Sequence, residues 1–196
     1  TPGTLIDESL LDDSTVNLLA ASKCSGTTAF VATTELSTGS FECYTCPIHR
    51  IDDLFERLFI SELIVPEDDE TLSQVATRQG IAVTTRPQWM FQKDEGESIL
   101  CKAYGVTTTE GFGIGESPDT IGTAGALLQY VQETQTSSDS LVHLTPPSMN
   151  HSDAVIALDA TTIRSLEIEK TIRSGEVEGS LLWVMQQCKT PMGKRM

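Results

Sequence analysis

Hydrophobic residues along the first half of the chain fall into short runs that predict β-strands. Residues 16–23 and 28–36 each hold such a run, and positions 29–32 are all apolar, as is typical of a central strand buried on both faces. Residues 41–46 follow a polar turn in which Gly39 can adopt a positive φ, so they are expected to return as a hairpin partner. The chain therefore begins its ordered part with three consecutive strands.

A helical period replaces the strand pattern after residue 50. Apolar residues at i, i+3, i+4, i+7 and i+8 form one stripe of a helix, and two aspartates suit its positive N-terminal end. The stripe consists of Ile51, Leu54, Phe55, Leu58 and Phe59. Further on, the pattern predicts a strand at 63–65, a helix at 69–79, a strand at 81–85, a helix at 94–104 and a helix starting at Pro118.

The order of these elements is β-β-β-α-β-α-β-α-α, which indicates an α/β layer fold. Hairpin strands come first, and parallel strands are then added through crossover helices. An RNase H-like mixed sheet flanked by helices fits this order. A flavodoxin-like sheet is the competing arrangement, although its strands usually all run parallel.

Composition changes after residue 134 and suggests a division of the chain. Residues 135–152 are rich in Ser and Thr and contain Pro146-Pro147, so they are expected to form a linker between residues 1–134 and residues 153–196. In the last part a helix is expected from Asp159 to about Arg173, and a second one from Leu181 onward. Two such helices cannot bury their apolar faces alone, so we expect them to begin a larger all-α region.

The charge of the chain is strongly negative and unevenly distributed. The net charge is −15; residues 1–134 carry 21 Asp and Glu against 7 Lys and Arg, and residues 135–196 carry 7 against 6. Affinity for nucleic acid depends on cations that neutralise phosphates, so the first part is a poor DNA clamp. Its charge either maintains solubility or faces a protein partner. No run approaches the roughly 18 apolar residues of a membrane span.

Two cysteines and a histidine form the first candidate chemical motif. Cys43-x-x-Cys46 is followed by His49, but a structural zinc site needs four ligands and no second pair is present. An odd total of 5 cysteines at irregular spacing also argues against a disulfide framework and fits a reducing compartment. We interpret the two thiols as structural.

Two glycine motifs are candidates for nucleotide binding. Residues 111–115 read G-x-G-x-G, whereas a dinucleotide fingerprint requires G-x-G-x-x-G directly after a strand. The single Gly-Lys pair, at 193–194, lacks the preceding glycine of a phosphate-binding loop. A tightly turned loop is the better interpretation of residues 111–115.

Acidic and aromatic residues provide the remaining candidates. A divalent-metal nuclease on an RNase H-like fold would need several converging carboxylates, and Glu35 and Glu42 flank a hairpin turn, where we expect them to be solvated. Trp89 and Phe91 could stack on a base or a partner, but packing onto the edge of the sheet is the expectation.

Seven short stretches, spread over nearly the whole chain, carry distinctive combinations of residues. They are residues 1–11 (TPGTLIDESLL), 17–21 (NLLAA), 35–41 (ELSTGSF), 86–91 (RPQWMF), 124–130 (AGALLQY), 158–168 (LDATTIRSLEI) and 190–195 (TPMGKR). In this order they resemble the MutS family of DNA mismatch repair proteins. The resemblance implies a connector domain followed by the start of the core or lever region. The abrupt termini likewise suggest an internal segment.

The resemblance also implies a function. The full protein would be a cytoplasmic homodimer that binds mismatched DNA, and that binds ATP with Mg at a site outside this segment. The segment itself would hold no catalytic group, cofactor or metal; it would relay between the mismatch-binding and ATPase domains and offer a docking surface to a MutL-type protein. By family position, helix 94–104 is expected to contribute Glu95, Ser98, Ile99 and Lys102 to that surface. A nuclease and a free-standing acidic adaptor are the alternatives.

Overall fold

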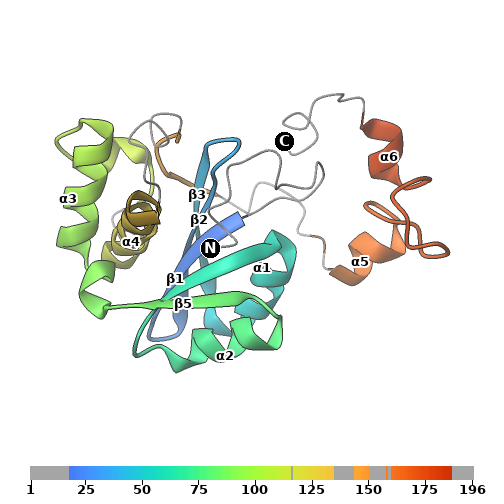
Figure 1. Ribbon diagram of the computed structural model, residues 1–196, viewed down its shortest axis with the longest axis horizontal. Helices are drawn as coiled ribbons and strands as arrows, with labels where there is room; N and C mark the ends of the chain where they lie inside the picture. Colours follow the sequence, from blue (N-terminus) through green and yellow to red (C-terminus); the bar gives the residue numbers. More distant parts are fainter. Residues whose placement is uncertain (1–17, 116, 135–143, 151–157, 159, 187–196) are drawn as a thin grey trace. The chain divides into compact units, whose positions relative to one another are not determined.

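The computed structural model describes residues 18–115, 117–134, 144–150, 158 and 160–186. They fall into two compact units: the described residues up to Asn150 form the first, and those from Leu158 onward form the second. The first unit contains a sheet and the helices that cover it, and the second contains two short helices (Figure 1).

The first unit is built around a mixed sheet of six strands in the order β5-β4-β1-β2-β3-β6. β1, β2 and β3 are antiparallel neighbours, whereas β4 runs parallel to β1, β5 to β4, and β6 to β3. The strands are β1 (Leu18–Ser25), β2 (Thr28–Glu35), β3 (Ser40–Pro47), β4 (Ile60–Pro66), β5 (Ala82–Arg86) and β6 (Ser148–Met149). The sheet confirms the α/β, RNase H-like prediction, and its mixed directions exclude the all-parallel flavodoxin-like alternative.

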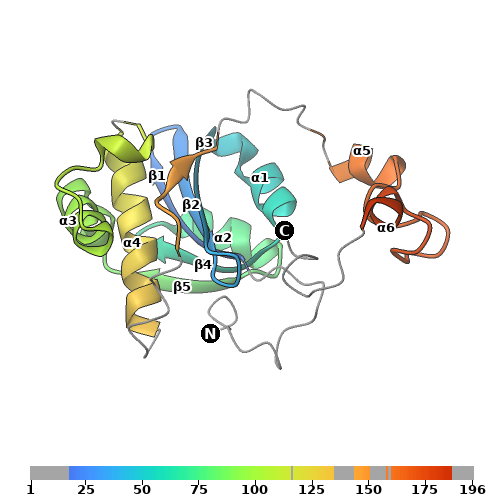
Figure 2. The same cartoon turned by 90° about the horizontal axis from the view of Figure 1, so that it is seen from above.

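Helices cover both faces of this sheet. α1 (Ile51–Leu58) and α2 (Glu70–Arg78) lie on one face, and α3 (Lys93–Tyr104) and α4 (Pro118–Thr134) lie on the other, with α4 nearer to the strands (Figure 2). Three short 3-10 helices complete the described part of this unit: η2 (Ile48–Arg50), η3 (Gln88–Phe91) and η4 (Glu110–Phe112).

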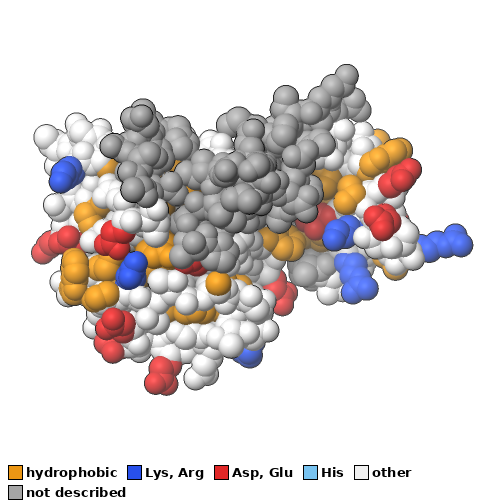
Figure 3. Space-filling model, in the orientation of Figure 1, with side chains coloured by type: hydrophobic (Ala, Val, Ile, Leu, Met, Phe, Trp, Pro, Cys, Tyr) orange, Lys and Arg blue, Asp and Glu red, His pale blue; other side chains and the backbone are white. Residues whose placement is uncertain are grey.

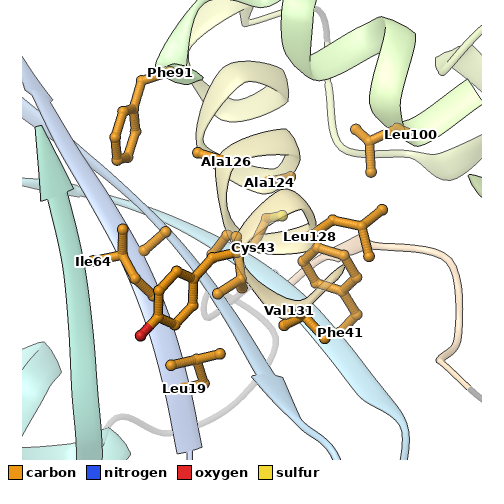
Figure 4. Close-up of a cluster of buried hydrophobic side chains, with 14 of the residues drawn as sticks. Leu19, Phe41, Cys43, Ile64, Phe91, Leu100, Ala124, Ala126, Leu128 and Val131 are labelled. Carbon is orange, nitrogen blue, oxygen red and sulfur yellow. The ribbon is translucent and has the colours of Figure 1, made fainter. Parts of the chain in front are cut away.

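Two hydrophobic cores result, one on each face of the sheet. Successive residues of β1 point to opposite faces, so Leu19 and Ala21 join the core under α4, while Ala20 joins the core under α1 and α2. Figure 4 shows the first of these cores, in which Leu128 and Val131 of α4 face the side chains of the strands. The apolar runs of the sequence are thus explained by burial on both faces.

One residue of the predicted helical stripe lies outside the core. Phe59 is the C-cap of α1 with a φ of 51°, and its side chain is 62% exposed. The prediction that Phe59 continues the buried stripe was wrong because the helix ends one residue earlier in a left-handed cap, which turns the side chain away from the sheet. The other stripe residues do pack against the second core.

Residues 144–150 belong to the first unit, although they fall inside the stretch expected to be a linker. Leu144 is buried in the first core, and β6 pairs with Glu42 and Cys43 of β3. Local sequence gave no sign of this strand, because it has only two residues and follows a Pro-Pro pair.

The second unit has shorter helices than the sequence suggested. α5 (Ala160–Ser165) ends well before Arg173, because Glu167 adopts a φ of 49° and its carboxylate accepts a hydrogen bond from the amide of Ile172. Asp159, the expected cap, lies outside the described residues. In α6 (Leu181–Met185) every side chain is exposed, as expected of a helix whose apolar face has nothing to pack against within the described residues of this unit.

Candidate functional site

The two glutamates of the nuclease hypothesis are occupied by hydrogen bonds of the β2–β3 hairpin. Glu35 is only 5% exposed and accepts hydrogen bonds from the amide and hydroxyl of Ser37 and from the amide of Thr38 at 2.9 Å. The expectation that Glu35 is solvated was therefore wrong: its carboxylate closes the turn.

Glu42 is held in a similar way on the neighbouring strand. Its carboxylate accepts hydrogen bonds from the hydroxyl of Tyr44 at 2.5 Å and from the side-chain amide of Asn150 at 3.0 Å. Burial and the bond to Glu42 raise the pKa of Tyr44, so the phenol keeps the proton that it donates. Among the described residues no group of three or more His, Cys, Asp or Glu side chains is arranged to hold a metal ion.

The thiols of the C-x-x-C motif point to opposite faces of the sheet. Cys43 is buried in the first core, whereas Cys46 packs against the second. Side chains alternate in direction along a strand, so two residues that are three positions apart point to opposite faces. Burial raises the pKa of Cys43 to about 12 and also raises that of Cys46. The pair therefore cannot converge on one metal ion, and both thiols are protonated at neutral pH.

The glycines of residues 111–115 allow the backbone to turn tightly. Gly113 and Gly115 have φ values of 68° and 77°, and Ile114 between them is buried in the first core. The helix α3, and not a strand, is the element before η4 and this loop, so the loop lacks the geometry of a dinucleotide fingerprint.

The aromatic pair of η3 is divided between core and surface. Phe91 is fully buried, whereas Trp89 is 51% exposed. The expectation of packing onto the sheet is right for Phe91 and wrong for Trp89, because residues two apart on this short 3-10 turn point in different directions.

The structure places the four predicted partner-binding residues along one stripe of α3. Glu95, Ser98, Ile99 and Lys102 stand at i, i+3, i+4 and i+7, and therefore share one side of the helix. Ser98 and Lys102 are exposed, and Glu95 and Ile99 are half-buried, with Ile99 also packed against the first core. Gly96 and Leu100 form the buried side.

Glycines fix α3 against α4. A Cβ atom added to Gly96, Gly122 or Gly125 would come closer than 3.0 Å to backbone atoms of the neighbouring segment, a separation that real Cβ atoms essentially never show. The neighbours are Ile121 and Gly122 for Gly96, Phe91 for Gly122, and Gly96 for Gly125. Such close backbone packing holds the stripe on a rigid support.

An ion pair fastens the start of α4 to the end of β1. The Lys23 ammonium lies 2.6 Å from the carboxylate of Asp119 and donates to the carbonyl of Phe91 at 3.4 Å. The two charged side chains are 18% and 25% exposed, so water screens the pair only in part.

A buried carboxylate fastens the end of α4 to the edge of the sheet. Glu62 of β4 is 1% exposed and accepts hydrogen bonds from the hydroxyls of Tyr130 at 2.6 Å and Thr84 at 2.9 Å. The Arg86 guanidinium lies 4.9 Å from the centre of the Tyr130 ring and pairs with Glu133 at 3.2 Å. The sequence of β4 alone did not predict these contacts.

The charged side chains on the visible face of the first unit are mostly acidic. Figure 3 shows more Asp and Glu than Lys and Arg side chains over this unit, and a more even mixture over the second. This distribution disfavours phosphate contacts on the acidic face. No described helix has the length and apolar character needed to cross a membrane.

Two family descriptions match the chain in succession. Residues 17–145 match MutS domain II, and residues 161–196 match MutS domain III. The first match alone covers more than half of the chain. The chain belongs to the MutS family. The MutS domain II match covers the described first unit up to Thr145 and leaves out residues 146–150. The domain III match covers α6 and all of α5 except its first residue, Ala160.

Individual relatives within the MutS family cover the whole segment. The DNA mismatch repair protein MutS of Anaplasma phagocytophilum (strain HZ) is 36% identical over 199 residues, which span 100% of this chain and 24% of that protein. The DNA mismatch repair protein MutS of Rhodopirellula baltica (strain DSM 10527 / NCIMB 13988 / SH1) is 36% identical over 215 residues, spanning 99% of this chain and 24% of that protein. The chain thus spans about a quarter of the length of these relatives.

Proposed function

We propose that this segment is the connector of a DNA mismatch repair protein of the MutS family, followed by the start of its core or lever region. In this proposal residues 1–134 form the connector, 135–152 a linker, and 153–196 the beginning of the lever. Residues 144–150 attach to the connector unit. The observation that carries the proposal is the succession of MutS domain II and MutS domain III along one chain.

The proposed role of the connector is mechanical and not catalytic. The carboxylates of Glu35, Glu42 and Glu62 serve hydrogen bonds within the fold, and the thiols of Cys43 and Cys46 face apart. A unit with two packed cores moves as one body, so it can relay between the mismatch-binding and ATPase domains. The whole protein would act as a cytoplasmic homodimer that binds mismatched DNA, and ATP with Mg, at sites outside this segment.

The proposed partner surface is the stripe of Glu95, Ser98, Ile99 and Lys102 on α3, and its occupant is a MutL-type protein. The glycine contacts to α4 support this choice because they hold the stripe rigidly, which lowers the entropic cost of docking. The excess of Asp and Glu over Lys and Arg in residues 1–134 favours a protein over a nucleic acid as the partner of this unit.

Binding of the full-length protein to a MutL-type partner in the presence of ATP tests the surface. Ser98→Arg places a long charged side chain in the middle of the stripe and is expected to weaken binding at least ~10-fold. Gln74→Arg, at an exposed position of α2, is the matched control and should change affinity by less than ~2-fold. Equal affinities for the two variants would rule out α3 as the docking surface.

A further inference from the structure

Residues 144–150 are attached to the first unit at two separate points. At the first point, the amide and the hydroxyl of Thr145 both donate to the carbonyl of Gly39, at 2.8 and 3.0 Å. The hydroxyl of Tyr104, at the end of α3, donates to the carbonyl of Thr145 at 3.0 Å. Hydrogen bonds therefore tie Thr145 both to the β2–β3 hairpin and to α3.

The second attachment point lies five residues further along. The amide of Asn150 donates to the carbonyl of Cys43 at 2.8 Å, and its side chain donates to Glu42 at 3.0 Å. Ser148 and Met149 pair with β3 between the two points, and Met149 packs against the first core. The intervening Pro146 and Pro147 have no amide hydrogen to satisfy, which suits the outer edge of a sheet.

We propose that residues 144–150 are a two-point latch, and that Tyr104 is a positioning residue that couples this latch to the docking helix α3. Asn150 is the last described residue of the first unit, so its hydrogen bonds to Cys43 and Glu42 fix the point from which the chain leaves this unit. Tyr104 lies two residues after Lys102, on the last turn of α3 before the left-handed cap at Gly105. A partner that holds this turn therefore also holds the hydroxyl that secures Thr145.

The latch is weak enough to respond to such a contact. Its strand contributes only two residues to the sheet, and the bond from Tyr104 to Thr145 is exposed. Segments with so few buried bonds open locally without unfolding the domain. The ring of Tyr104 is independently fixed against Phe112, with centroids 5.4 Å apart, so the hydroxyl is a separable part of the contact.

This inference rests on the proposed docking of a partner on α3, and hydrogen exchange of the Thr145 and Asn150 amides in the full-length protein tests it. Without a partner, Tyr104→Phe should keep the ring packing and lose the bond, so exchange at Thr145 becomes ~2–5-fold faster. Gln74→Ala, at an exposed position of α2 outside the proposed docking surface, should leave this exchange unchanged.

With the MutL-type partner bound, exchange at Thr145 should slow at least ~3-fold in the native protein, because coupling between two sites is reciprocal. Tyr104→Phe should still bind the partner but lose this slowing, whereas a latch with a merely structural role would be slowed equally in both proteins. Equal slowing, or none in the native protein although the partner is bound, would overturn the latch proposal and leave the docking surface standing. A partner that does not bind, or that binds Ser98→Arg as tightly as the native protein, would overturn both.

Discussion

Gly125 of α4 faces Gly96 of α3 at a point where the two helices touch through their backbones. A Cβ atom on Gly125 would lie closer than 3.0 Å to the Cα of Gly96, and nothing between the helices can yield. The distance between α3 and α4 is thus set by the absence of side chains at these two positions. The position of the proposed docking stripe on α3 depends on this spacing.

Gly125→Ala is accordingly expected to destabilise the chain. The added methyl group must push α3 and α4 apart, and overpacking of this kind costs ~1–3 kcal/mol. Gly111→Ala is the control, because a Cβ atom there meets nothing within 4 Å and Gly111 has no positive φ. Urea denaturation of both variants measures the difference. A Gly125→Ala chain as stable as the control would show that the two helices can separate freely.

A second prediction concerns the ion pair between Lys23 and Asp119. Because both side chains are largely buried and only 2.6 Å apart, a double-mutant cycle to alanine is expected to give a coupling free energy of ~1–2 kcal/mol. Arg78 and Asp52 provide the comparison: they are 3.5 Å apart with exposures of 67% and 45%, so their coupling should stay below ~0.5 kcal/mol. Similar couplings for the two pairs would mean that burial does not strengthen the first.

The third prediction concerns the network around Glu62. Tyr130→Phe removes the hydroxyl that donates to a carboxylate with only 1% exposure, so the free energy of unfolding should fall by ~1–3 kcal/mol. Tyr104→Phe, at a more exposed hydrogen bond, should cost less than ~1 kcal/mol. Thermal or urea unfolding compares the two. A smaller loss for Tyr130→Phe than for Tyr104→Phe would argue against a structural role for Glu62.

The same network shows where prediction from sequence succeeds and where it stops. The order of strands and helices and the mixed sheet were predictable, because each element carries its own hydrophobic period. Glu62 was not predictable as a buried residue, since its partners Tyr130 and Thr84 lie 68 and 22 residues away. A charged residue on a short strand gives no local sign of such distant donors.

For the candidate partner surface, the sequence predicted the helix and the spacing of its residues, and their role in binding stays a prediction. The stripe on α3 follows from helical spacing, once a family resemblance indicates which helix to examine. The latch could not be foreseen, because Thr145 and Asn150 are held by Gly39 and Cys43, more than 100 residues earlier in the chain. Pro146 and Pro147 suggested a linker, and the same prolines are compatible with an edge strand of two residues.

A fourth prediction follows from the buried thiol of Cys43. Its pKa is raised by burial from 9.0 to about 12, so between these values the unfolded chain releases a proton that the folded chain retains. The unfolded state then binds fewer protons than the native state, and stability must fall as the pH rises through this window. Between pH 8 and pH 10 this single group should remove about 1 kcal/mol from the free energy of unfolding.

Urea unfolding of the native chain and of Cys43→Ala at both pH values isolates this contribution. The variant loses some packing at either pH, but its stability should depend on pH by about 1 kcal/mol less than that of the native chain. Cys24, whose pKa is also raised to about 12, keeps a similar dependence in both proteins, so it cancels in the comparison. Burial and, to a smaller extent, the nearby Cys43 raise the pKa of Tyr104, so the comparison is made in a Tyr104→Phe background, which removes that contribution from both proteins. If the two proteins lost the same amount between pH 8 and pH 10, the Cys43 thiol would have to ionise as readily in the folded state as in the unfolded chain.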